Sequence, residues 1–425
     1  MNDKQLAAHV ADGGKLRATV LELWQRTRMD WGFVTDRLAT TFRKETWIGA
    51  HERRFISEAI YGMVRHLRKI DLALARGRRT KKSPRDLERL LALLVLEKLI
   101  EPARAAQVEP DLDWRAVASV DEVIAAERKL ATRIALAASL PDWLAARLAA
   151  DWGDQAEPLA LALNERAPMT VRANLLVGDR DALAKELVLD THPGRWSATA
   201  LIIDARTNLF SLPAFKRGAM EAQDEGSQLL ADLATPGSLV IDYCAGAGGK
   251  TLAIAARMAN RGRIIACDVD AAKLEELRRR ARRAQVSNAR ALLIGSAELD
   301  AFRGKADVVF VDAPCSGIGA LRRNPEARWR LAESDIATFA ARQREIMEAA
   351  ITFAAPDARI VYATCSLLAA ENEEVARSLA GVAQVDLADV LGDQRARALG
   401  RDGAFTVAPH SHGTDGFYAR VMKRI

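Results

Sequence analysis

The most constraining feature of the chain is the regular alternation of apolar strands and helices in its C-terminal half. Five apolar segments are typical of strands: 238–244, 263–270, 289–295, 307–314 and 359–366. The segments between them with helical patterns are 250–259, 271–285 and 336–353. This alternation is typical of a parallel sheet covered by helices on both faces. We therefore expect a doubly wound α/β domain over 231–425, with its ligand outside the carboxyl ends of the strands.

Two further parts precede this domain. Over 1–145 apolar residues recur at helical spacing, as in the stripe within 16–24, which predicts an all-α domain. Over 146–230 the elements become short and mixed, with strands expected at 169–177 and 199–204. We interpret this stretch as a small α/β linker domain, so the sequence predicts a multidomain protein.

The composition excludes several classes of protein. Of the 425 residues, 49% are hydrophobic and 28% are charged, which is enough for two or three packed cores. No apolar run nears the roughly 18 residues of a membrane span, and the first residues lack the pattern of a secretory signal. We therefore expect a cytoplasmic protein. The 4 cysteines form no Cys-x-x-Cys pair, so we expect reduced thiols and no metal site.

The net charge of +6 is concentrated in three clusters. The stretch 65–85 holds nine basic residues and one acid, Asp71. The other clusters are Arg278, Arg279, Arg280, Arg282 and Arg283, and Arg322, Arg323, Arg328 and Arg330. Clusters of this kind are typical of surfaces that bind a phosphate backbone. One cluster alone is just as typical of a solvated helix face, but three, with the site described next, favour an RNA partner.

A glycine-rich turn over 242–251 follows the first strand of the C-terminal domain. A phosphate-binding P-loop would need glycine where the chain has Cys244, and a dinucleotide fingerprint would need glycine where it has Thr251. The remaining candidate is S-adenosylmethionine, whose ribose hydroxyls could bind Asp268 at the end of the next strand. Asp270 could instead cap the following helix. A tight turn without a ligand is the other interpretation of this segment.

Two cysteines lie where predicted strands end. Cys315 follows Asp312-Ala313-Pro314, and Cys365 follows Thr364. Both thiols are therefore expected at the carboxyl edge of the sheet, beside the cofactor. Either one taken singly could be a small buried side chain, as we interpret Cys267.

A thiol beside a methyl donor suits one reaction in particular. Carbon 5 of cytosine is a weak nucleophile until a thiolate adds to carbon 6 and loads the ring with electron density. Asp312 is the candidate acid for the charge that develops at ring N3, and a second thiol can assist release of the product. Amino-group methylation is the rival reaction, but the segment at Asp312 lacks the second proline and the aromatic residue typical of those enzymes.

Several motifs resemble one known family. They are DYCAGAGGKT (242–251), ACDVD (266–270), DAPCSGIGALRRNPEARWR (312–330), YATCSLLAAENEE (362–374) and HGTDGFYARVMK (412–423). Together they resemble the RsmB/Sun-type family of RNA cytosine-C5 methyltransferases, over most of 160–425. The segment 52–71 is similar to the NusB-like RNA-binding domain found in that family.

The resemblance implies a role for each site residue. It implies that Cys365 is the nucleophile, that Cys315 assists product release, and that Asp312 is the acid before the Pro-Cys motif. The cofactor residues it implies are Cys244, Ala245, Gly246, Ala247, Gly248, Gly249, Lys250, Asp268 and Asp312. The chain departs from the family at Gly246-Ala247, where Ala-Pro is usual, which makes the loop more flexible. It also departs at Ser296, where the family has an acid near the adenine.

These observations predict an S-adenosylmethionine-dependent RNA cytosine-C5 methyltransferase that acts on 16S ribosomal RNA. We expect a Rossmann-like class I methyltransferase domain, a monomer, and no binding to DNA or membranes. The target cytosine must be flipped out of the RNA to reach the pocket. A transfer-RNA enzyme with the same chemistry, or an RNA-binding ribosome-assembly factor without turnover, are the alternatives.

Overall fold

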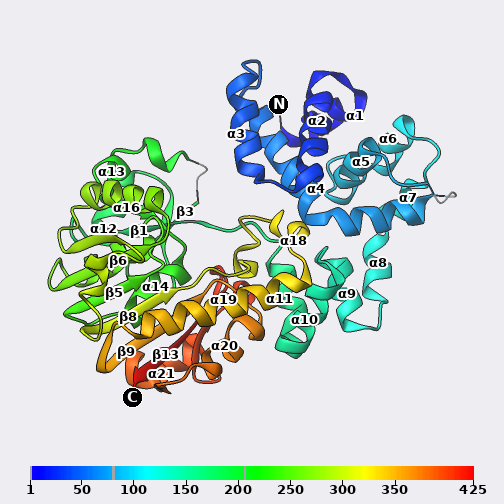
Figure 1. Ribbon diagram of the computed structural model, residues 1–425. Helices are drawn as coiled ribbons and strands as arrows, with labels where there is room; N and C mark the ends of the chain where they lie inside the picture. Colours follow the sequence, from blue (N-terminus) through cyan, green and yellow to red (C-terminus); the bar gives the residue numbers. More distant parts are fainter. Residues whose placement is uncertain (1, 79–81, 205–206) are drawn as a thin grey trace. The chain divides into compact units, whose positions relative to one another are not determined.

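The computed structural model describes residues 2–78, 82–204 and 207–425 (Figure 1). The chain divides into two compact units. One consists of Met1–Glu165 with Leu321–Glu333, and the other of Arg166–Ala320 with Ser334–Ile425. The chain therefore passes between the units three times, after residues 165, 320 and 333. The expected division at 145 and 230 into functional domains stays a prediction.

The first unit is built from helices. In chain order these are α1 (Asp3–Asp12), α2 (Gly14–Asp30), α3 (Val34–Lys44), α4 (Ala50–Gly77), α5 (Asp86–Leu96), α6 (Pro102–Val108), α7 (Trp114–Ala118), α8 (Val120–Ala125), α9 (Leu130–Ala137), α10 (Asp142–Trp152), α11 (Ala156–Ala162) and α18 (Ala327–Arg330). The helices expected over 1–145 are thus present, and they continue to Ala162. The similarity of this part to NusB stays a prediction.

The core of this unit forms around α4 and α5. Five consecutive residues of α5, Leu90–Leu94, are almost completely buried, so this part of the helix is surrounded by other elements on all sides. Trp24 of α2 is also completely buried, and its indole nitrogen donates to Asp86 Oδ1 at 3.0 Å. A buried indole N–H requires such a partner. Trp114 of α7 is buried as well, so both tryptophans pack inward.

The segment 321–333 belongs to this helical unit, although it follows the Pro-Cys motif in the sequence. Arg328 of α18 is completely buried; its Nη1 donates to Ala138 O at 2.9 Å and to Asn164 Oδ1 at 2.6 Å. Burial lowers the pKa of Arg328 to about 9. Trp329 Nε1 donates to Val64 O at 2.8 Å. The segment is therefore fixed by buried polar contacts as well as by apolar packing.

The second unit begins with a small antiparallel sheet, in the strand order β2-β3-β1-β4. Its elements are β1 (Met169–Ala173), α12 (Arg180–Leu187), β2 (Thr191–Pro193), β3 (Ala200–Ile203), η2 (Leu209–Ser211), α13 (Pro213–Lys216) and β4 (Met220–Ala222). The two strands expected in this part are present but shorter than predicted, as β1 and β3.

The larger sheet of this unit has the order β11-β12-β13-β9-β8-β5-β6-β7, with β10 paired to β13. Its parallel strands are β5 (Leu239–Tyr243), β6 (Arg263–Asp268), β7 (Ala289–Leu293), β8 (Ala306–Asp312) and β9 (Ala354–Thr364). Its antiparallel strands are β10 (Val382–Gln384), β11 (Gly400–Arg401), β12 (Ala404–Val407) and β13 (Phe417–Arg424).

The sheet is therefore mixed: the five strands expected from the sequence are parallel, and the antiparallel strands at its C-terminal edge were not predicted. The parallel strands could be predicted from the sequence because each is a continuous stretch of buried apolar residues. By contrast, β13 contains Arg420 and Lys423, and β10 to β12 are only two to four residues long. Such segments give no clear signal of a strand.

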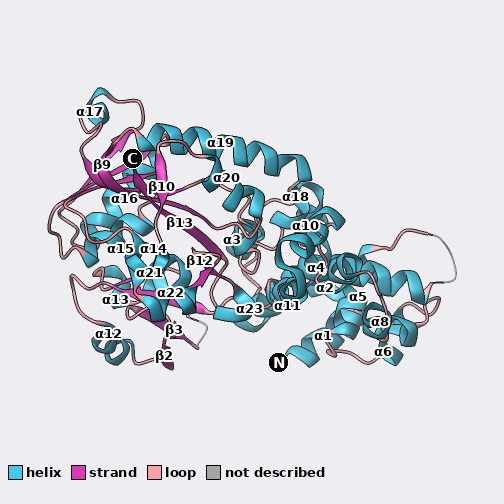
Figure 2. Ribbon diagram, turned by 90° about the horizontal axis from the view of Figure 1, so that it is seen from below, coloured by secondary structure: helices cyan, strands magenta, loops and turns pink. Residues whose placement is uncertain are grey.

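Helices cover both faces of this sheet (Figure 2). Ile241 of β5 packs with Met347 of the long helix α19 (Glu333–Ile351), while its neighbour Val240 packs on the opposite face. That face is covered by α14 (Glu225–Leu233), α15 (Gly249–Arg257) and α21 (Leu387–Leu391). Alternate residues of one strand therefore belong to the hydrophobic cores on opposite faces of the sheet, as a doubly wound fold requires.

The remaining elements of this unit are α16 (Ala271–Arg283), α17 (Ala297–Asp300), η3 (Ile318–Ala320), η4 (Ala369–Glu371), α20 (Glu373–Ser378), α22 (Asp393–Leu399) and α23 (Pro409–His412). In the part of the chain that the structure describes, no helix is both long enough and apolar enough to span a membrane.

Candidate active site

The two predicted cysteines meet at the carboxyl edge of the larger sheet. Strands β8 and β9 are parallel neighbours, with Asp312 opposite Ala363. Cys315 follows β8 and Cys365 follows β9, and their Sγ atoms lie 3.4 Å apart. Both side chains are partly exposed. The expectation that both thiols emerge at one edge of the sheet is confirmed, while their catalytic roles stay a prediction.

Close backbone contacts fix the loops that carry the two thiols. Gly319 N donates to Cys365 O at 2.9 Å, and Gly416 N donates to Gly319 O at 2.9 Å. A Cβ atom on Gly319 would lie 2.2 Å from Gly416 O and 2.8 Å from Cys365 O, so only glycine fits there. The segments after β8, after β9 and before β13 therefore lock against one another at the active-site edge.

The two thiols differ in their environment. The hydrogen bond with Cys365 raises the pKa of Cys315 well above its ordinary value, and burial and the charges of Cys365 and Glu371 act in the same direction. Cys315 therefore keeps its proton, and either sulfur can donate the sulfur–sulfur hydrogen bond.

A lysine lies beside the same edge. Lys250, in the first turn of α15, forms an ion pair with Asp312, with Nζ 2.5 Å from Oδ2. Its Nζ also lies 5.6 Å from the ring centre of Phe417. Burial acts to lower the pKa of Lys250, but the charges of Asp312, Cys365 and Asp242 outweigh it and the pKa is raised. The ammonium is therefore a permanent positive charge next to Asp312 and Cys365.

The turn over 244–250 has open space in front of it, and the carboxylate of Asp268 lies beside it. Gly246 N donates to Asp268 Oδ2 at 2.9 Å, and Asp270 N donates to Asp268 Oδ1 at 2.9 Å. Each carboxylate oxygen can accept a second hydrogen bond, which leaves places for ribose hydroxyls. A Cβ atom added to Gly246 or Gly249 would meet nothing within 4 Å, so open space lies in front of the loop. These residues fit the expected S-adenosylmethionine.

Several neighbours of this loop have structural explanations. Asp270 caps α16 by accepting from Ala272 N and Lys273 N, which confirms the alternative considered for it. Ser296 caps α17 through Leu299 N. Burial raises the pKa of Cys244 to about 12, so this thiol is not reactive at neutral pH.

Sequence reasoning missed two buried acids at the site. Asp242 at the end of β5 is completely buried; Thr251 Oγ1 donates to its Oδ2 at 2.5 Å, and Oδ1 has no hydrogen-bond partner. Burial raises the pKa of Asp242 to about 7. Glu371 is also completely buried and accepts hydrogen bonds from the serines that follow both cysteines. The repeated Cys-Ser pair was the only sequence signal for Glu371.

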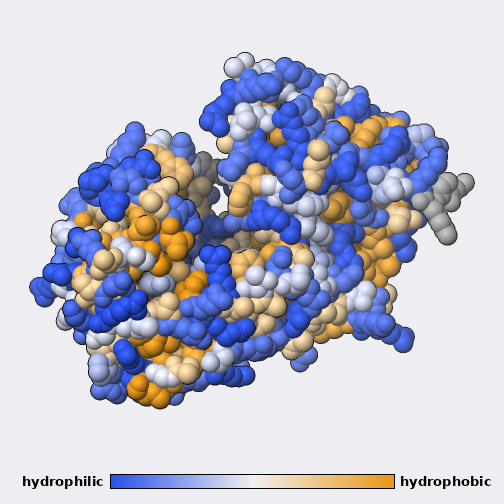
Figure 3. All heavy atoms as spheres, in the orientation of Figure 1, coloured by the Kyte–Doolittle hydropathy of each residue, from blue (hydrophilic) through white to orange (hydrophobic). Residues whose placement is uncertain are grey.

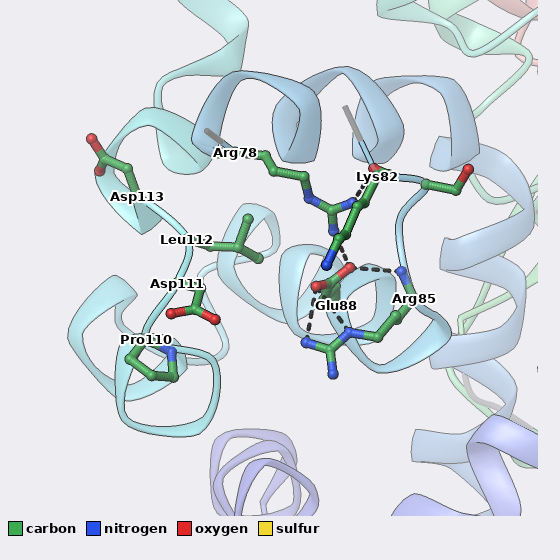
Figure 4. Close-up of a pocket in the computed structure, with 9 residues that line it drawn as sticks. Arg78, Lys82, Arg85, Glu88, Pro110, Asp111, Leu112 and Asp113 are labelled. Carbon is green, nitrogen blue, oxygen red and sulfur yellow. Dashed lines mark hydrogen bonds and ion pairs between the residues drawn. The ribbon is translucent and has the colours of Figure 1, made fainter. Parts of the chain in front are cut away.

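The basic stretch 65–85 borders a cavity of about 770 Å³ in the helical unit (Figure 4). Arg78 and Arg85 converge on Glu88, whose side chain is 7% exposed, and Arg85 also pairs with Glu109. The charges of Arg78 and Arg85 are therefore largely balanced. Arg76 and Lys82 are exposed. Arg79 and Lys81, which belong to the same predicted cluster, lie outside the described residues.

The other two clusters are largely structural. Every arginine of the α16 cluster pairs with a glutamate, and Arg280 and Arg283 both bind Glu221 of β4, whose side chain is 4% exposed. In the third cluster Arg322 and Arg328 are buried. The structure thus favours ion pairing over RNA contact for most of these residues.

His412, near the C-terminus, is held by partners within the fold. His412 Nε2 lies 3.0 Å from Ala398 O, and its Nδ1 lies 2.8 Å from Ser411 Oγ. Over 2–78, 82–204 and 207–425, no three histidine, cysteine or acidic side chains are arranged to hold a metal ion.

Comparison with known proteins gives matches in both units. Residues 231–423 match the model of a family described as 16S rRNA methyltransferase RsmB/F, and residues 140–209 match the RsmF/B-like ferredoxin-like domain. The ribosomal RNA small subunit methyltransferase B of Shewanella oneidensis is 32% identical over 297 residues, 68% of this chain and 68% of that protein. The protein with the same description from Xylella fastidiosa is 34% identical over 316 residues, 71% and 72% of the two chains.

Solved structures share the fold. The crystal structure of PH0851 matches with a TM-score of 0.74 at 23% identity, covering 96% of this chain and 98% of that one. NSun6 from Pyrococcus horikoshii, solved with SFG, matches with a TM-score of 0.59 at 20% identity, covering 67% and 98%. These similarities confirm the expected Rossmann-like fold of the larger sheet.

Proposed function

Because the chain belongs to the RsmB/F family of 16S rRNA methyltransferases, we propose that it methylates carbon 5 of a cytosine through a temporary bond to Cys365. The methyl donor is S-adenosylmethionine, which supplies an electrophilic methyl group when bound in front of residues 244–250. The observation that carries the proposal is the 3.4 Å separation of two thiols at the carboxyl ends of β8 and β9. Methylation of an amino group needs no thiol.

Addition to the base is the first step. Cys365 sulfur bonds to carbon 6, the carbon 5–carbon 6 double bond opens, and electron density moves toward ring N3. Lys250 lies close enough to stabilise a thiolate on Cys365. Lys250 and Asp312, 2.5 Å apart, together offer a proton to N3, which N3 returns when carbon 5 accepts the methyl group.

Release of the product needs a proton to leave carbon 5. Cys315 gives its proton to the sulfur of Cys365 as the carbon 6–sulfur bond breaks. The Cys315 thiolate takes the proton of carbon 5, and the electron pair of that bond restores the double bond. Cys315 is then a thiol again, and Cys365 loses the proton it received to water and returns to the thiolate that starts the next cycle. The short sulfur–sulfur distance supports the direct transfer.

The RNA substrate must present an unstacked base. Bases in an RNA helix are stacked and paired, so the target cytosine is expected to be flipped toward Cys365. We propose that the helical unit supplies part of the affinity, through exposed cations such as Arg76 and Lys82 rather than through the paired arginines of α16.

The test uses 16S rRNA fragments, S-adenosylmethionine and three cysteine variants. Cys365→Ala is expected to give neither adduct nor 5-methylcytidine, because the attacking sulfur is gone. Cys315→Ala is expected to accumulate a covalent protein–RNA adduct. Cys267→Ala, in the interior of β6, is the control and should behave as wild type. Equal yields of 5-methylcytidine from wild type and Cys365→Ala would contradict the proposal, as would a product methylated on the amino group.

A further inference from the structure

A buried acid joins the two cysteine loops. Glu371 is the last residue of η4, six positions after Cys365, and it is completely buried. Its Oε1 accepts from Ser316 N at 2.8 Å and from Gln343 Nε2 at 3.1 Å. Its Oε2 accepts from Ser316 Oγ and, at 2.6 Å, from Ser366 Oγ. One carboxylate therefore binds the residue that follows each cysteine.

The surrounding contacts make this arrangement rigid. Ser316 Oγ and Ser366 Oγ lie 3.3 Å apart, and Tyr362 OH donates to the backbone carbonyl of Glu371. Tyr362 OH lies 3.1 Å from Gln343 Oε1, and Gln343 Nε2 donates to Pro314 O at 3.0 Å. The loop after β8 is thus held through Pro314 and Ser316, and the loop after β9 through Ser366.

Burial of the Glu371 carboxylate lowers the stability of the folded state, because the group loses its hydration. No ion pair of Glu371 with lysine or arginine exists among the described residues. A buried carboxylate without a cation depends entirely on hydrogen bonds to offset its lost hydration. An apolar side chain at this position would pack two loops with less cost. The carboxylate of Glu371 is therefore explained better by the two cysteine loops that it orients than by a contribution to stability.

We propose that Glu371 is a positioning residue that holds the sulfur atoms of Cys315 and Cys365 at the separation needed for product release. This inference rests on the proposed function, in which a proton passes directly between the two sulfurs. Glu371 acts through Ser316 and Ser366 and touches neither sulfur nor substrate. Its charge also helps to raise the pKa of Cys315, together with the larger effects of the Cys365 hydrogen bond and burial.

The kinetic test compares Glu371→Gln with Glu374→Gln, which changes an exposed acid three residues away. The glutamine keeps the volume but faces the two serine hydroxyls with an amide NH₂ in place of Oε2. We expect kcat to fall about tenfold or more, with KM for RNA within about twofold, because positioning of the reacting groups is lost while RNA contacts remain. The covalent adduct should accumulate, as with Cys315→Ala.

A second measurement reports the sulfur geometry without any turnover. Diamide oxidises two adjacent thiols to a disulfide and is itself reduced to the hydrazine, and the reaction requires the sulfurs to reach about 2 Å. We expect rapid formation of the Cys315–Cys365 disulfide in wild type and Glu374→Gln, and formation at least about fivefold slower in Glu371→Gln. Peptide mass spectrometry identifies the bond.

A double-mutant cycle tests whether the serines carry the effect. Ser366→Ala alone should reproduce much of the loss in disulfide rate, and Glu371→Gln should add less to Ser366→Ala than to wild type. Circular dichroism checks that each variant is folded, and Ser366→Ala replaces Glu371→Gln if the latter does not fold.

The outcomes separate this inference from the proposed function. Unchanged kcat and unchanged disulfide rate in Glu371→Gln would overturn the positioning role, even if the enzyme makes 5-methylcytidine. A slower disulfide in Glu371→Gln combined with full activity of Cys365→Ala would leave the geometric role intact and overturn the cysteine mechanism. Additive effects of Glu371→Gln and Ser366→Ala would also overturn the inference.

Discussion

Asp242 is the side chain whose protonation the fold controls most clearly. It is completely buried beside Asp312 and Asp268, and one of its oxygens has no hydrogen-bond partner. Burial raises its pKa from 3.8 to about 7. The protonated form is therefore favoured in the folded state, and ionisation of Asp242 works against folding.

This shift predicts how stability depends on pH. Because the pKa is higher in the folded state, the contribution of Asp242 to the free energy of unfolding is most favourable below pH 3.8. This contribution is lost progressively as the pH rises from 3.8 to about 7. Asp242→Asn removes this loss, so its urea midpoint should exceed that of wild type increasingly from pH 5 to pH 8. The difference in the free energy of unfolding between variant and wild type should grow by about 3 kcal/mol between pH 5 and pH 8. A constant difference across this range, or the same trend in the exposed control Asp389→Asn, would contradict the assignment.

Lys250 predicts a second measurable effect. Its ammonium lies beside Asp312, at the edge that carries Cys365. In Lys250→Met methylation should fall by about a hundredfold or more, because the positive charge at the reacting edge is lost. Lys305→Gln changes an exposed lysine and is the control. Equal rates of 5-methylcytidine formation in Lys250→Met and wild type would rule out an electrostatic role for Lys250.

The short helix α18 depends on one buried arginine. Arg328 donates to the carbonyl groups of Ala138 and Pro325 and to Asn164 Oδ1, so removing its guanidinium takes a donor away from three acceptors in the interior of the helical unit. Arg328→Met should therefore lower the free energy of unfolding by about 3 kcal/mol. Arg330→Gln, at an exposed position of the same helix, should change it by less than about 1 kcal/mol. Equal effects in urea unfolding would contradict this.

The elements differ in how far the sequence predicts them. The parallel strands were predictable because each pairs apolar residues on both faces, as Val240 and Ile241 do on β5. The C-terminal strands were not, because pairing with β9 stabilises them more than their own pattern does. The juxtaposition of Cys315 and Cys365 followed from topology, whereas the role of Glu371 depends on contacts between distant loops that spacing alone does not reveal.

The distribution of charge over the molecule predicts its salt dependence. Arg78 and Arg85 of the first cluster and every arginine of the α16 cluster pair with acids, whereas Arg76 and Lys82 are exposed members of the first cluster. Replacing both with glutamine should weaken RNA binding and reduce the slope of log affinity against log salt by about 1.5. The matched double variant Arg279→Gln with Arg282→Gln, in ion pairs on α16, should leave the slope unchanged. Equal slopes for wild type and the first variant would exclude that surface.

Because the chain crosses between its two units at three points, the two units are constrained to evolve together. A module joined to its neighbour at one point can be gained or lost by a single recombination event. Here thirteen residues, 321–333, belong to the helical unit but are encoded within the methyltransferase sequence. Descendants that discard the N-terminal helices would keep Arg328 without the carbonyl groups that bury it. Such lineages should show a rewritten stretch after the Pro-Cys motif, so the two parts are bound to evolve together.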